Sequence, residues 1–131
     1  MKKSFLFNIL FIGFVLFSCH KSESDDNPPA LTITSPTAGS SFGVGQTISI
    51  TGSVTDESLH ELLISVTRKS DGSILFTPTN PPEVHDLTSY NIDEKWNPVG
   101  ISSTTPVTLT ISAEDHDDHL TIKTVDFTIN P

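Results

Sequence analysis

Residues 114–119 hold the densest group of potential metal ligands in the chain. They read Glu-Asp-His-Asp-Asp-His, four acids and two imidazoles. Imidazole combined with carboxylate suits zinc, copper or nickel, whereas oxygen ligands alone suit calcium. Zinc takes about four ligands at roughly 2.0–2.2 Å, and a single turn seldom supplies all of them. A metal site at this turn would therefore need ligands from other loops.

Two further histidines, His60 and His85, lie in segments that also read as loops. The favoured ligand set is three histidines and one carboxylate: His116, His119 and His85, with Asp115 or Asp117. His60 is a weaker candidate, because its alternation with Leu62 points it toward the edge of the core. Calcium is less favoured than zinc or copper, since the glycine and spacing of an EF-hand loop are absent. The alternative is a solvated acidic rim with histidines dispersed among polar turns.

The segments that must position these residues read as strands. Seven stretches alternate apolar with polar residues, a period-two pattern typical of strands with one solvated face. They are residues 31–34, 47–54, 62–67, 74–77, 88–96, 107–113 and 121–129. Leu120 and Ile122 have the opposite parity to Val125, which predicts a bulge or an irregular start in the last strand. Seven short strands in about 100 residues predict an all-β sandwich.

The order of these strands brings the histidines together. A hairpin at Asp71-Gly72 joins the third and fourth strands, and successive connections of such a meander alternate between the two ends of a sandwich. The connections before the third, fifth and last strands then share one end. They carry His60, His85, His116 and His119. We therefore expect these imidazoles to be neighbours.

The first eighteen residues predict an export signal. A basic Met-Lys-Lys start precedes a largely apolar run at residues 5–17, which is shorter than the roughly 20 residues that span a bilayer. The sequence Leu-Phe-Ser-Cys at residues 16–19 resembles the lipobox of bacterial lipoproteins. That resemblance implies lipidation of Cys19, the only cysteine, and so attachment to a membrane. The alternative is an ordinary cleaved signal.

Residues 19–29 comprise this cysteine and a short acidic tether, and residues 30–131 form the folded domain. The tether has no large apolar residue, so we expect a disordered spacer. Its acids Glu23, Asp25 and Asp26 resemble the export tag on surface-exposed lipoproteins of Bacteroidota. The resemblance implies the cell envelope, at the outer membrane and exposed on its surface. A plain polar linker is the alternative.

Composition excludes several classes of protein. A chain of 131 residues allows one domain, and a single cysteine excludes a disulfide framework or a thiolate zinc cluster. After residue 18, five basic and sixteen acidic residues give a formal charge of −11. This charge argues against nucleic acid as a partner. It also repels the protein from anionic headgroups, so attachment to the membrane would depend on the covalent lipid on Cys19.

Three segments carry a resemblance to a family. Residues 31–36 (Leu-Thr-Ile-Thr-Ser-Pro), 45–52 (Gly-Gln-Thr-Ile-Ser-Ile-Thr-Gly) and 54–56 (Val-Thr-Asp) resemble bacterial Ig-like domains of surface proteins. With residues 90–96 (Tyr-Asn-Ile-Asp-Glu-Lys-Trp), the wider pattern is similar to small Ig-like lipoproteins of Bacteroidota. The resemblance implies a single Ig-like β-sandwich of about seven strands, with no settled activity.

The aromatic residues Trp96 and Tyr90 are candidate ligand contacts, since such rings stack on sugar faces; the alternative is that both belong to the core. Glycosidase work needs two carboxylates across a cleft, and a sandwich of this size has little room for one. We therefore expect no enzyme.

The expected function is a lipid-anchored binding or adhesion module of the cell envelope, with a surface protein or a glycan as partner. The alternative function is a divalent-metal-binding lipoprotein that holds zinc or copper.

Overall fold

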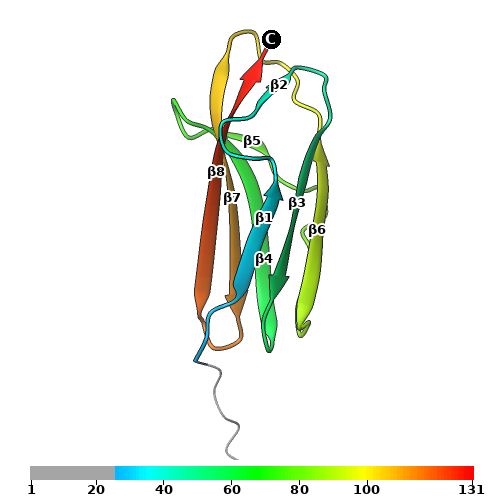
Figure 1. Cartoon of the computed structure of the whole chain (residues 1–131), viewed down its shortest axis with the longest axis vertical. Helices are drawn as coiled ribbons and strands as arrows, with labels where there is room; N and C mark the ends of the chain where they lie inside the picture. The colour runs from blue at the N-terminus through cyan, green and yellow to red at the C-terminus, as the bar shows by residue number, and fades with distance from the viewer. Residues whose placement is uncertain (1–25) are drawn as a thin grey trace, which may run out of the picture.

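The computed structural model describes residues 26–131 and shows strands joined by loops (Figure 1). The expected signal, Cys19 and most of the tether lie outside the described residues. Nowhere in residues 26–131 does a helix occur with the length and apolar composition needed to cross a membrane. The prediction of an all-β sandwich is confirmed.

The sandwich has eight strands, where the sequence predicted about seven. They are β1 (Ala30–Ser35), β2 (Ser41–Gly43), β3 (Ile48–Thr55), β4 (Leu59–Arg68), β5 (Ile74–Phe76), β6 (Ser89–Trp96), β7 (Thr105–Asp115) and β8 (Leu120–Asn130). The additional strand is β2, which pairs in parallel with the end of β8. Its three residues include one large apolar side chain, Phe42, so they contain no alternation from which a strand could be predicted.

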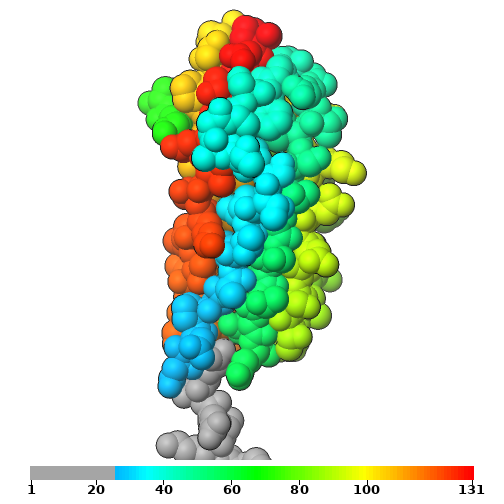
Figure 2. Space-filling view, in the orientation of Figure 1, coloured from blue at the N-terminus to red at the C-terminus, as the bar shows by residue number. Residues whose placement is uncertain are grey.

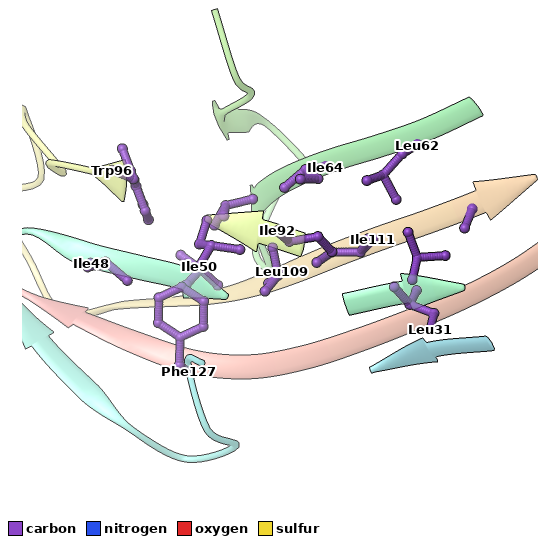
Figure 3. Packing of buried hydrophobic residues seen from close by; sticks show 14 of the residues in the cluster. Leu31, Ile48, Ile50, Leu62, Ile64, Ile92, Trp96, Leu109, Ile111 and Phe127 are labelled. Atoms are coloured by element: carbon purple, nitrogen blue, oxygen red, sulfur yellow. The ribbon is translucent and has the colours of Figure 1, made fainter. Parts of the chain in front are cut away.

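The strands form two sheets that enclose one core. The smaller sheet has the order β1-β3-β6 and the larger has the order β2-β8-β7-β4-β5. Every second residue of β7, from Thr105 to Asp115, is buried. Leu31, Ile48, Ile50, Leu62, Ile64, Ile92, Leu109, Ile111 and Phe127 meet between the sheets (Figure 3). Each large apolar side chain buried in this way contributes about 1.5–3 kcal/mol.

The last strand differs from the prediction. β8 pairs with β7 in one unbroken register, from Ile129 opposite Thr105 to Leu120 opposite Glu114. The expected bulge was wrong. Because the register is kept, Leu120 and Ile122 point to the outer face of the sheet, where they are 52% and 56% exposed.

Three connections meet at one end of the sandwich, as the meander predicted. The β3–β4 and β7–β8 connections lie at the bottom of Figure 1, where the β5–β6 connection also ends, and the C-terminus lies at the opposite end. The N-terminal segment enters at the same end as these connections, because Ala30 pairs with Thr55 and the Thr121 hydroxyl donates to the Pro29 carbonyl at 2.7 Å. Figure 2 shows the start of β1 packed beside the start of β8 at this end.

The two strands β1 and β3 approach closely at Gly52. A Cβ atom on Gly52 would overlap the backbone carbonyl oxygen of Thr32. We predict that Gly52→Ala lowers the free energy of unfolding by about 2–4 kcal/mol, because the backbone of β1 must move away. Urea denaturation measures this change. Gly43→Ala is the matched control, since the space around this strand glycine is open. A Gly52→Ala variant as stable as the control would contradict the prediction.

Candidate metal centre

Three imidazoles from three separate segments, the start of β4, the β5–β6 connection and the β7–β8 connection, converge at the end where the chain enters the sandwich. His60, His85 and His116 each offer a nitrogen, and these nitrogens all lie within 4.8 Å of one another. The ring centroids are 5.2 Å apart for His60 and His85, 4.9 Å for His60 and His116, and 4.6 Å for His85 and His116. All three side chains are exposed. The name "histidine triad" is used below for these three residues.

A bulge at the start of β4 positions His60. Leu59 pairs with Asp115 and Glu61 pairs with Glu114, so His60 is the extra residue between two consecutive pairs. Since Leu59 is fully buried, the bulge turns His60 outward. The alternation with Leu62 predicted a side chain at the edge of the core, and that prediction was wrong because a bulge breaks the period of two.

Buried and hydrogen-bonded neighbours fix His85. Val84 is buried in the core just before it. Just after it, the Asp86 N–H donates to the Leu59 carbonyl, and the Leu87 carbonyl accepts the Leu59 N–H, both at 2.9 Å. The backbone of Asp86 has a φ of 63°, a conformation that aspartate tolerates better than most residues. His85 is therefore held beside β4 although it lies in a long connection.

His116 is the first residue after β7, and its N–H donates to the Ser58 carbonyl at 3.2 Å. Its Nε2 is hydrogen-bonded to Asp86 Oδ1 at 2.9 Å, and Asp86 Oδ2 lies 3.8 Å from Nε2 of His85. One carboxylate thus reaches two members of the histidine triad. Asp86 was not among the favoured ligands in the sequence, although its position beside His85 was a usable signal.

The other predicted ligands do not join the histidine triad. Asp115 is only 2% exposed. It accepts hydrogen bonds from the backbone N–H groups of Asp117 and His119 and from the His119 ring, each at 2.8 Å. Asp115 therefore organises the β7–β8 turn, and the His119 ring faces this carboxylate. Asp117 lies exposed in the same turn.

The surroundings of Asp115 set its protonation. Burial by itself raises the pKa of the carboxyl, but the hydrogen bonds from the backbone and ring of His119 and the backbone of Asp117 outweigh it. The pKa of Asp115 consequently lies below its ordinary value. The turn is thus held by an ionised, buried carboxylate.

The aromatic candidates occupy the core or pack against it. Trp96 is 7% exposed and stacks on Phe76, with ring centroids 5.8 Å apart. Tyr90 is partly buried and packs against the same core. The covered faces of Trp96 leave no platform for a sugar ring, so the alternative of a core role holds for Trp96.

The geometry of the histidine triad suits a metal ion after a small movement. Nitrogens bound to one tetrahedral zinc lie about 3.3–3.5 Å apart, as Zn–N bonds of roughly 2.0–2.1 Å require. The rings therefore need to close by roughly 1 Å or a little more, which exposed side chains achieve by rotation. Asp86 can complete a four-ligand set. Nitrogen donors with one carboxylate favour zinc or copper over calcium.

The family model described as bacterial Ig domain matches residues 29–95, just over half of the chain. No curated protein matches the chain in sequence.

Comparison with solved structures finds similar folds at low sequence identity. The fibronectin(III)-like modules of Clostridium thermocellum CbhA share 18% identity over 76% of this chain and 94% of theirs, with a TM-score of 0.47. An engineered protein shares 16% identity over 79% of this chain and 20% of its own, with a TM-score of 0.52. CopC from Methylosinus trichosporium OB3b shares 11% identity over 78% of this chain and 95% of its own, with a TM-score of 0.47. The chain thus spans a fifth of the engineered protein, and these similarities concern the fold alone.

The buried carboxylate of Asp115 predicts acid sensitivity. Because its pKa is lowered in the folded protein, its stabilising contribution is present above the unfolded pKa of about 3.9 and is lost as pH falls through the folded value. We predict that Asp115→Asn lowers the free energy of unfolding by about 1–3 kcal/mol at pH 7. The difference from wild type should shrink toward pH 3. Urea denaturation of metal-free protein measures it, and a difference independent of pH would contradict the assignment.

Proposed function

The chain belongs to the bacterial Ig domain family, and from that premise we propose that it is a non-catalytic binding module of the cell envelope whose ligand is a divalent transition-metal ion. The observation that carries the proposal is the histidine triad, with its three nitrogens within 4.8 Å. Zinc or copper is the expected ion, because the donors are imidazoles with a neighbouring carboxylate.

The origin of the triad in three separate segments of the chain supports a site rather than a chance grouping. The bulge at His60, the buried Val84 before His85 and the end of β7 before His116 each direct one imidazole to the same point. If these histidines were only part of a solvated polar rim, their imidazoles could equally well point apart. Convergence of all three needs a separate cause, and metal binding supplies one.

The exposure of the triad favours binding over catalysis. All three imidazoles face solvent, so the site is not enclosed by protein. Enzymes stabilise developing charge in sites from which water is excluded, where fixed dipoles act most strongly. An ion bound at this end of the sandwich would lack such an enclosure. A binding role therefore fits the geometry best.

The proposed envelope location rests on Cys19 as the lipidated residue. The spacer from Cys19 to Pro29 is eleven residues, which extend to about 40 Å at most. The segments that carry the triad share an end of the sandwich with Pro29. A lipid on Cys19 would thus hold the triad on the membrane-facing side of the domain, at the outer membrane if the acidic tether is an export tag.

Metal binding is tested on the mature chain carrying Cys19→Ser, stripped with EDTA and titrated with zinc and with copper. We predict one ion per chain by elemental analysis after dialysis, and a saturable heat by calorimetry. His60→Ala, His85→Ala and His116→Ala should each weaken binding by about 100-fold or more, because each removes a ligand.

The matched control is His119→Asn, which removes an imidazole from the same turn as His116 while retaining a donor for Asp115. Its affinity for zinc should match that of the parent protein. A parent protein that binds no ion, or triad variants that bind as tightly as the control, would refute the metal site.

Lipidation is tested separately in a bacterial host that processes lipoproteins. We predict that the wild-type chain incorporates labelled palmitate and partitions into detergent, because lipid chains stabilise membrane attachment by roughly 0.8 kcal/mol per buried CH₂. The Cys19→Ser variant should lose both properties. Equal behaviour of the two chains would exclude Cys19 as the anchor.

A further inference from the structure

The strand β4 has a neighbour along only part of its outer edge. β7 pairs with β4 along nearly its whole length, from Leu59 to Arg68. On the other side, the three-residue β5 pairs only with Val66 and Thr67. Residues 61–65 of β4 consequently have no strand on the side away from β7.

Backbone hydrogen bonds at both ends of β4 show which residues face this open edge. The Leu59 N–H donates to a carbonyl of the β5–β6 connection, and the Arg68 N–H donates to the β4–β5 turn. The backbone N–H groups of both residues therefore point away from β7. Backbone groups of alternate strand residues point to the same side, so the N–H and C=O groups of Ile64 point to the open edge. Those of Leu62 do so too, because the bulge at His60 keeps Leu62 in phase with Leu59.

These edge groups have no partner in the neighbouring connection. Among residues 26–131, no backbone hydrogen bond joins residues 61–65 of β4 to residues 77–84. Pro81 and Pro82 in that connection have no N–H to offer. An open edge with unpaired N–H and C=O groups is a template for another strand.

A groove follows the same edge. Two adjoining pockets of 430 and 290 Å³ share Leu62, Leu63, Pro81 and Pro82 in their lining. Leu63 is 50% exposed, so the groove offers apolar contact beside the open backbone groups. The larger pocket reaches His60 and His85 of the histidine triad.

The charge around the groove indicates the sign of the charge that a bound segment would carry. Glu61 and Glu83 line the larger pocket, and Asp86 lies beyond it, close to His85 and His116. Residues 26–131 contain fourteen acidic residues and only four basic ones. A complementary segment would be positively charged, since like charges oppose association.

We propose that this groove binds an extended, basic segment of a partner protein, which adds as a strand to the free edge of β4. Backbone hydrogen bonds to Leu62 and Ile64 supply affinity, and the apolar lining and the acidic rim supply selectivity. The proposal rests on the edge of β4 and is independent of metal binding.

The test uses the mature chain with Cys19→Ser in EDTA, so that its outcome is separate from that of the metal titration. The probe is the labelled peptide Lys-Val-Thr-Val-Thr-Val-Lys with blocked ends, and fluorescence anisotropy measures its affinity. A peptide with Glu in place of both Lys should bind about tenfold more weakly or worse. A peptide N-methylated at alternate residues should lose about as much, because it cannot form the ladder.

Two further measurements locate the bound peptide. Hydrogen exchange of the Leu62 and Ile64 amides should slow by about tenfold or more in the complex, since strand addition pairs them. Leu63→Lys should weaken binding of the Lys-capped peptide by about tenfold. Ile122→Lys is the matched control, because Ile122 is similarly exposed on the same sheet and lines neither pocket.

Three results would overturn the proposal. The first is no binding of the Lys-capped peptide at up to about 1 mM, the weakest affinity of interest. The second is peptide binding that leaves hydrogen exchange of the Leu62 and Ile64 amides unchanged, or that Leu63→Lys and Ile122→Lys weaken equally. The third is a dimer by light scattering in which these amides are protected without peptide, since the occupant would then be a second copy of the chain.

Discussion

The antiparallel pairing of β4 with β7 is the constraint on which the rest of the structure depends. Nine of the ten residues of β4 pair with β7, and the inward-facing side chains of both strands are buried between the sheets. Because one face must stay in the core, neither strand can slip by a single residue. The pairing therefore fixes where β4 begins relative to where β7 ends. His60 and His116 are neighbours for that reason.

The candidate metal centre combines a rigid base with loosely held ligands. Val84 is inserted in the core and Asp115 is hydrogen-bonded within its turn, so the backbones that carry His85 and His116 are well supported. The imidazoles themselves are exposed, and the hydrogen bond of His116 is to the exposed Asp86, so a small rotation of the rings toward an ion meets no core packing. This division differs from an enzyme active site, where packing also holds the reacting side chains in place.

Both proposed sites belong to the same part of the molecule. The groove along β4 begins at His60 and His85 and runs beside residues 61–65. The chain enters the sandwich at the end that carries the triad. With Cys19 as the anchor, a peptide in the groove and an ion at the triad would both be bound within reach of the membrane.

The sequence by itself determined the class of fold and the end of the sandwich at which the histidines lie. Alternation over two residues is a local property, and seven of the eight strands follow from it. The hairpin at Asp71-Gly72 then decided which connections share an end. β2 could not be foreseen, because its three residues are a strand only through pairing with β8, far along the chain.

Only the tertiary structure decided which side chains form the candidate centre. The bulge that turns His60 outward exists because β4 must keep both Leu59 and Leu62 in the core. The hydrogen bond between His116 and Asp86 joins atoms thirty residues apart, which meet only when the two connections are packed together, whereas the bond between His119 and Asp115 closes within the β7–β8 turn. Periodicity reports which face of a strand is buried. It does not report where a ladder gains a residue or which of two nearby carboxylates an imidazole will contact.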